Sequence, residues 1–180
     1  IALNGNNEPL LKRDICKYIK YAKEAGVLEI SLHTNGLPLD EEFSRELLDS
    51  GLTIIMFSID AFNKKTYEQS RQGGDYDKLL ENVLGFVELK KASGKVLPIT
   101  RVSFIENKAN FGELEEFKRF WEDKVDYVFI QNFLNLFEGK DNYQQVVEKY
   151  QWGNKSFSAC YEPFKRLFVM HNGDVVPCCQ

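Results

Sequence analysis

The segment Thr53-Ile54-Ile55-Met56-Phe57-Ser58-Ile59 is a continuous apolar run of the length of one strand, and Asp60 follows it. An uninterrupted run of this kind suits a strand that is covered on both faces, as in a parallel sheet. A strand with one solvent-exposed face instead shows alternating apolar and polar residues. The run therefore predicts a buried strand of a parallel sheet, with a polar side chain at its carboxyl end.

Similar strand-like segments recur on both sides of this run, with helix-like segments between them. Strands are expected to start near positions 1, 28, 53, 99 and 126, and this spacing is typical of successive βα units. Amphipathic helices are expected over residues 10–25, with Leu11 on the apolar face, over 76–87, and after a reciprocal cap formed by Asn110 and Glu113. The alternation predicts an α/β fold with right-handed crossovers, either an open parallel sheet or part of a (β/α) barrel.

The composition excludes some partners. The net charge of −4 comes from 27 acidic and 23 basic residues, which are spread along the 180-residue chain without a basic block. Nucleic-acid binding through a phosphate-neutralising patch is therefore disfavoured. No apolar run approaches the roughly 20 residues of a membrane span, and no signal peptide opens the chain. We therefore expect no nucleic acid and no membrane among the partners, and a cytoplasmic location.

Polar residues follow each expected strand, at the edge where parallel α/β proteins bind ligands. Glu8 could hold an ammonium group there, and Ser58 or Asp60 could hold ribose hydroxyls. His33 is either a ligand or base or a hydrogen-bonded structural residue, and Arg71 either binds an anion or is a solvated loop residue. The five polar strand ends are Asn4–Pro9, His33–Gly36, Ser58–Asp60, Glu106–Asn107 and Gln131–Asn132.

The end of the chain gathers cysteines around a predicted hairpin. Asn172-Gly173 separates two short β-type runs and predicts a two-residue turn. That turn would bring Cys178 opposite Leu167, near the segment that leads from Cys160 into the hairpin. Thiols gathered in this way hold zinc or an iron–sulfur cluster, and because such sites take four ligands as a rule, a longer protein is expected. Cys179 points to the other face of a regular strand, so it would be a ligand only if a bulge turns it. Reduced core thiols are the alternative.

Four segments together carry a family resemblance. They are Asn6-Asn7-Glu8-Pro9, similar to a Gly-Gly-Glu-Pro segment, Thr34-Asn35-Gly36, Ser58-Ile59-Asp60 followed by Thr66-Tyr67 and Arg71-Gln72-Gly73-Gly74, and the spacing of Cys160, Gly173 and Cys178. Twelve residues separate Cys160 from Gly173 and four separate Gly173 from Cys178. In this order the segments resemble a radical S-adenosylmethionine (SAM) enzyme with a C-terminal SPASM or twitch extension.

The resemblance implies a partial (β/α)6 TIM-like barrel with parallel strands over residues 1–134. A linker and the start of a small β-hairpin cysteine module would follow over residues 135–180. It implies an enzyme that acts on a peptide, a protein or a small molecule, with an electron donor such as flavodoxin or ferredoxin, and it assigns no catalytic residue. The implied SAM-binding residues are Asn6, Asn7, Glu8, Thr34, Asn35, Ser58 and Asp60, and the implied ligands of an auxiliary [4Fe–4S] cluster are Cys160, Cys178 and, third in rank, Cys179.

The chain departs from the family pattern in two places. Asn6-Asn7 replaces the pair of glycines, and the Cys-x3-Cys-x2-Cys loop that holds the SAM-cleaving cluster does not occur in the sequence. We therefore expect a fragment that starts at the second barrel strand and is inactive alone. The leading alternative is a non-catalytic α/β domain with structural zinc and a partner-binding cleft. A third is a barrel lyase or aldolase without a cluster, for which Lys108 is the one lysine at a strand end.

Overall fold

The computed structural model describes residues 1–5, 7–107, 109–131, 164–170 and 172–177. The chain divides into two compact units, Ile1–Val146 and Val147–Gln180.

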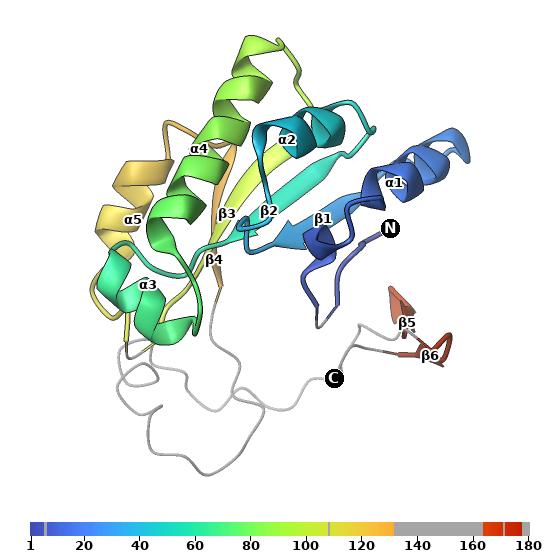
Figure 1. Cartoon of the computed structure of the whole chain (residues 1–180). Coiled ribbons are helices and arrows are strands. Elements are labelled where there is room, and N and C mark those ends of the chain that lie inside the picture. Colours follow the sequence, from blue (N-terminus) through green and yellow to red (C-terminus); the bar gives the residue numbers. More distant parts are fainter. Residues whose placement is uncertain (6, 108, 132–163, 171, 178–180) are drawn as a thin grey trace. The chain divides into compact units, whose positions relative to one another are not determined.

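The first unit contains a parallel sheet in the order β1-β2-β3-β4 (Figure 1). Ala2 adds an isolated parallel bridge to Ser31 on the outer side of β1, where Leu3 N donates to Ser31 O and Ser31 N to Ile1 O, both at 2.8 Å. Each expected strand is present, the first of them as this bridge, and the predicted α/β fold with parallel strands is confirmed. The strands are β1 (Ser31–Thr34), β2 (Ile54–Ser58), β3 (Ile99–Ile105) and β4 (Tyr127–Gln131).

β1 begins three residues later than expected, at Ser31 rather than near position 28. The cause is the side chain of Thr53, whose Oγ1 accepts from Ile30 N and donates to Ile30 O, both at 2.8 Å. Because this hydroxyl takes the N–H of Ile30, only the Ile30 carbonyl, which accepts from Thr53 N at 3.0 Å and from Ile54 N at 3.2 Å, joins the backbone ladder, and regular pairing starts at Ser31.

The helix expected over residues 10–25 is wrong in its first part. The Glu8 side chain caps a short 3-10 turn, and Lys12 after that turn is extended, so Leu11 is 77% exposed instead of lying on an apolar face. The other expected helices are present. The helical elements are η1 (Pro9–Leu11), α1 (Ile15–Glu24), α2 (Glu41–Leu48), α3 (Lys64–Ser70), α4 (Tyr76–Ala92) and α5 (Leu114–Trp121).

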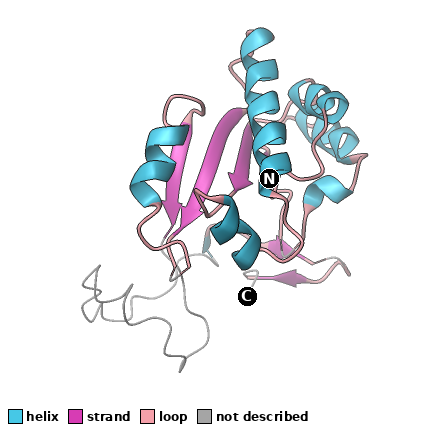
Figure 2. Ribbon diagram, turned by 60° about the vertical axis from the view of Figure 1, so that its left-hand side comes forward, coloured by secondary structure: helices cyan, strands magenta, loops and turns pink. Residues whose placement is uncertain are grey.

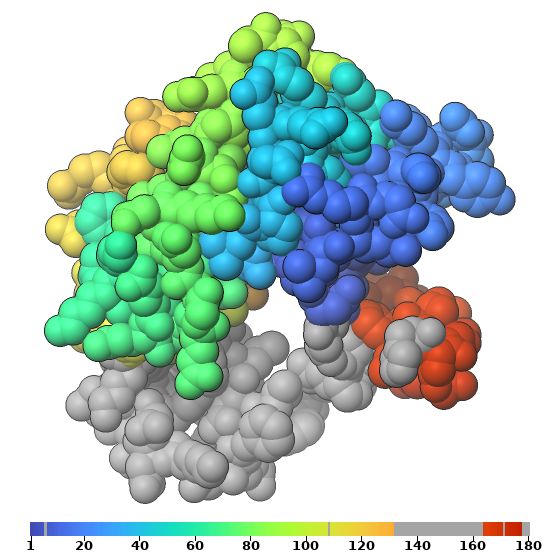
Figure 3. Space-filling view, in the orientation of Figure 1, coloured from blue at the N-terminus to red at the C-terminus, as the bar shows by residue number. Residues whose placement is uncertain are grey.

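The helices pack against one face of the sheet. Phe57 of β2 meets Phe86 of α4 with ring centroids 5.7 Å apart, and Phe104 of β3 meets Phe117 of α5 at 4.9 Å. All four rings are fully buried, and each buried ring contributes about 1.5–3 kcal/mol of stability. In the space-filling view α2 and α4 lie side by side (Figure 3). In the view turned by 60° the strands are visible between α4 and α5 (Figure 2).

Successive side chains of a strand point to opposite faces, so a second set of residues lies on the face away from these helices. We call this surface the open face. Its residues include His33 on β1, Met56 and Ser58 on β2, Arg101 and Ser103 on β3, and Tyr127 and Phe129 on β4.

In the second unit, β5 (Phe168–Val169) and β6 (Val175–Val176) form the predicted antiparallel hairpin, but the two-residue turn is wrong. Phe168 pairs with Val176, and the turn closes where Gly173 N donates to Met170 O at 3.0 Å. Gly173, with a φ of +89°, is therefore the last residue of the turn and not one of its two central residues, which moves the register by one residue. Cys160, Cys178 and Cys179 lie outside the described residues.

Over the described ranges, none of the helices combines the length and the apolar character that crossing a membrane requires.

Candidate functional site

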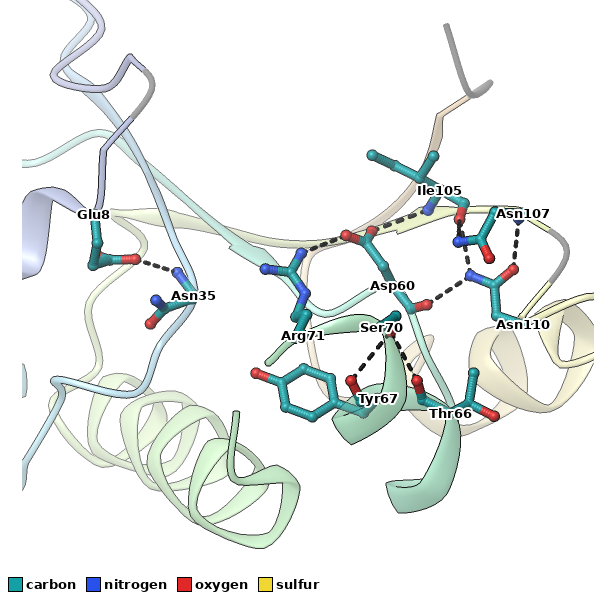
Figure 4. Close-up of polar contacts among 10 residues, drawn as sticks. All are labelled: Glu8, Asn35, Asp60, Thr66, Tyr67, Ser70, Arg71, Ile105, Asn107 and Asn110. Atoms are coloured by element: carbon teal, nitrogen blue, oxygen red, sulfur yellow. Dashed lines mark hydrogen bonds and ion pairs between the residues drawn. The ribbon is translucent and has the colours of Figure 1, made fainter. Parts of the chain in front are cut away.

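Glu8 joins the first loop to the carboxyl end of β1. Its Oε1 accepts from Thr34 Oγ1 at 2.7 Å and from Leu10 N at 3.0 Å, and its Oε2 accepts from Asn35 N at 2.7 Å (Figure 4). Thr34 is 2% exposed and its Oγ1 also accepts from Gly36 N at 3.0 Å. Glu8 is thus brought into direct contact with two other predicted site residues, Thr34 and Asn35, that lie 26 and 27 positions away in the sequence.

The loop before Glu8 contains an acceptor without a donor. Asn7 is exposed, and its Oδ1 accepts from Gly5 N at 3.2 Å. Asn4 Oδ1 is buried and has no hydrogen bond among the described residues. Since a buried polar atom without a partner costs about 1–3 kcal/mol, this oxygen fits a site that receives a donor from a ligand. Asn6 lies outside the described residues.

Asp60 lies two residues after the end of β2 and has an unusual backbone conformation. Its φ is +59°, the only positive value among the described residues other than glycine. Oδ1 accepts from Ile105 N at 3.0 Å and Oδ2 from the Arg71 guanidinium at 2.5 Å (Figure 4). Burial raises the pKa of the Asp60 carboxyl, and Arg71 opposes that shift. Ser58, two residues earlier, is half-buried on the open face and pairs with Ser103.

The predicted reciprocal cap of Asn110 and Glu113 is wrong. Asn110 Nδ2 donates to the carbonyl oxygens of Asp60 at 2.7 Å and of Ile105 at 2.8 Å, so it holds the ends of two strands together (Figure 4). Glu113 makes no side-chain bond to its own helix. Its carboxylate accepts from Phe62 N at 2.7 Å and from Thr66 Oγ1 at 2.5 Å. Both side chains therefore support the loop that carries Asp60.

Tyr67 was noted in the sequence only as part of a motif. Its ring is fully buried, and its hydroxyl is the second buried side-chain oxygen without a hydrogen bond among the described residues. A Cβ at Gly74 would lie 2.7 Å from Tyr67 Cε1, so glycine leaves the space that the ring fills. The occurrence of Thr66-Tyr67 and Gly73-Gly74 in one motif was the only sequence signal for this contact, and it did not predict that the Tyr67 ring packs against Gly74.

The metal ligands predicted from the sequence, Cys160, Cys178 and Cys179, all lie outside the described residues. Within the described residues, no group of three or more His, Cys, Asp or Glu side chains is arranged to hold a metal ion. Cys16 lies buried on α1, where burial raises its thiol pKa to about 11, so it is a poor thiolate donor.

Comparison with solved structures gives the same fold. SuiB of Streptococcus suis in its complex with SAM superposes with a TM-score of 0.65 at 18% identity, over 96% of this chain and 47% of SuiB. SuiB bound to the precursor peptide SuiA gives a TM-score of 0.61 at 16% identity. At this level of identity the likeness concerns the fold alone.

Curated relatives are similar over most of the chain. A probable GTP 3',8-cyclase of Methanocaldococcus jannaschii is 30% identical over 143 residues, which cover 79% of this chain and 45% of that protein. The GTP 3',8-cyclase of Peptoclostridium acidaminophilum is 33% identical over 127 residues, which cover 69% and 37%. This chain thus spans less than half the length of either relative. The family model described as the Radical SAM superfamily matches residues 5–120, which include Glu8, Thr34, Asn35 and Asp60. The chain belongs to the Radical SAM superfamily.

Proposed function

We propose that this chain forms the SAM-binding part of a radical SAM enzyme, with the ligand at the carboxyl ends of β1 and β2. When bound with a reduced [4Fe–4S] cluster, SAM supplies a 5′-deoxyadenosyl radical that takes a hydrogen atom from a substrate. The observation that carries the proposal is the Glu8 carboxylate, held by Thr34 and Asn35, and the loop before it also contains the unpartnered Asn4 oxygen.

The residues at this edge fit the two polar ends of SAM. Each carboxylate oxygen accepts about two hydrogen bonds, so Glu8 Oε2, with one donor in place, can take another from an ammonium group. Asn6 and Asn7 would lie beside the same group. The Asp60 carboxylate accepts from Ile105 N, from Arg71 and from the Ser103 side chain, which leaves about one of its four acceptor positions for a ribose hydroxyl, with Ser58 as a neighbour.

The finer assignments are also proposals. Cys160, Cys178 and Cys179 would bind an auxiliary [4Fe–4S] cluster of a SPASM or twitch module, and a flavodoxin or ferredoxin would supply electrons. The relatives carry the name of a nucleotide cyclase, whereas the structural neighbour binds a peptide, so the substrate would be a peptide or a small molecule. Iron and sulfide analysis separates the cluster from structural zinc.

Equilibrium dialysis with radiolabelled SAM tests the proposed site. We expect the wild-type chain to bind SAM and Glu8→Gln to bind at least about tenfold more weakly, because charge-assisted hydrogen bonds contribute roughly 1.5–3 kcal/mol. Glu42→Gln is the matched control, since Glu42 is exposed on α2. Equal affinity of the wild type and the Glu8 variant, or no binding by the wild type, would contradict the proposal.

A further inference from the structure

Four side chains form a row across the open face. In the sheet register His33 pairs with Met56, Met56 with Arg101, and Arg101 with Tyr127. Adjacent strands lie about 4.8 Å apart, so neighbours in this row are within side-chain reach of one another. Met56 is 5% exposed whereas Tyr127 is 59% exposed, so the row runs from a covered centre to an accessible edge.

Arg101 stands out among the arginines of the first unit. Arg13, Arg45 and Arg71 each pair with a carboxylate at 2.5–2.7 Å. Among the described residues Arg101 and the exposed Arg119 have no such pair, and the guanidinium carbon of Arg101 lies 5.6 Å from the centroid of the Tyr127 ring. Arg101 is half-buried. A partly desolvated guanidinium that presents five donors and stacks on an aromatic ring is suited to a planar or tetrahedral anion.

We propose that Arg101 binds an anionic group of the substrate, a carboxylate or a phosphate, on the open face of the sheet. The inference rests on the proposed function, because it places the substrate beside the SAM site. Ser58 pairs with Ser103, which is two residues, or about 7 Å, from Arg101 toward the carboxyl ends of the strands. A molecule held at Arg101 would therefore extend toward the edge where the adenosyl group is proposed to lie.

His33 is the second polar group of the row. Burial lowers the pKa of the His33 imidazole, and the positive charge of Arg101 lowers it further. The ring is therefore neutral at pH 7 and can exchange a hydrogen bond with a ligand without adding a second cation. It also reports on the charge beside it, because an anion that neutralises Arg101 removes one cause of the shift.

The test is an NMR titration of His33 in the 180-residue chain, with inorganic pyrophosphate and succinate as separate probes at constant ionic strength. The chain has two histidines, so His171→Gln identifies the His33 signals. We expect one probe to raise the pKa of His33 saturably. In Arg101→Gln that pKa starts higher and neither probe moves it, and the dissociation constant measured by calorimetry weakens at least about tenfold. The preferred probe distinguishes a phosphate from a carboxylate.

Three controls separate the outcomes. Arg119→Gln removes an exposed arginine from α5 and is expected to bind the probe like the wild type. Arg101→Lys keeps the charge without the planar fork and is expected to bind with intermediate affinity. The inference is wrong if neither probe raises the pKa of His33 in the wild type. It is also wrong if a probe raises that pKa as much in Arg101→Gln as in the wild type. If the chain still binds SAM in that case, the proposed function is unaffected. If instead the chain binds the anion but not SAM, the proposed function is contradicted and the anion site at Arg101 is not.

Discussion

At the scale of single residues, Asp60 is in a conformation that most side chains avoid. A left-handed residue other than glycine costs roughly 1–2 kcal/mol, and Asp and Asn tolerate it best because their short polar side chains bond locally. Asp60 receives bonds at both carboxylate oxygens and at its carbonyl oxygen, so its surroundings hold it in place. The strain coincides with the proposed ribose contact, as is common at ligand sites.

Replacement of Asp60 by Asn tests the electrostatics of this position, since Asn accepts the same backbone angles. The folded-state pKa of Asp60 is raised by burial, so the wild type loses stability as the pH rises through that pKa, and the variant does not. We expect the variant to gain free energy of unfolding relative to the wild type as the pH rises above about 4, the ordinary pKa of an aspartate carboxyl, measured by urea denaturation. The opposite trend would mean that the ion pair with Arg71 outweighs burial.

At the scale of elements, Lys90 and Asp126 join α4 to the amino ends of β3 and β4. Asp126 Oδ2 accepts from Lys90 Nζ at 2.6 Å, from Thr100 N at 2.6 Å and from Thr100 Oγ1 at 2.7 Å. The Lys90 side chain is 9% exposed and that of Asp126 is 36% exposed. Burial opposes the charge of Asp126, but the bonds from Lys90 and Thr100 outweigh it and lower the pKa of Asp126.

Removal of one partner of this pair is expected to cost more than removal of the other. Asp126→Ala leaves a buried ammonium unpaired and should lower the free energy of unfolding by about 2–3 kcal/mol, whereas Lys90→Met should cost less than about 1 kcal/mol. Urea denaturation measures both. Glu41→Ala, which breaks the exposed pair with Arg45, is the control and should cost less than about 0.5 kcal/mol. Equal losses for Asp126→Ala and Lys90→Met would refute the asymmetry.

The sequence predicted the centres of elements better than their ends. The apolar run before Asp60 was sufficient to identify β2, because periodicity is a local property. The start of β1 depends on the hydroxyl of Thr53, 23 residues from Ile30, and no local pattern contains that contact. Asn110 and Glu113 form a cap signal locally, yet the side chains bond to residues about 50 positions away. Glu8, Thr34 and Asn35 were predicted together because parallel strand ends share one edge.

At the scale of the whole molecule, the described apolar core belongs to the first unit. Its buried members extend from Leu10 to Val125, whereas the described apolar side chains of the second unit include Phe164 at 87% exposed and Leu167 at 71%. A two-stranded hairpin alone is only marginally stable in water. The stability of the first unit should therefore be independent of the hairpin.

Truncation after Val146 tests this independence. We expect the shortened chain to unfold cooperatively with a free energy of unfolding within about 1 kcal/mol of that of the 180-residue chain, as followed by circular dichroism in urea. A non-cooperative transition or a much larger loss would show that residues 147–180 contribute to the core.

The three donors on Glu8 have a kinetic consequence. Because Leu10, Thr34 and Asn35 immobilise the carboxylate in the folded chain, the side chain loses its rotational freedom during folding and not when a ligand arrives. An ammonium group could therefore bind the Glu8 carboxylate without a prior rearrangement of that side chain. Its association should then proceed at the pace of diffusional encounter, and differences in affinity among ligands should be expressed in how slowly each one leaves.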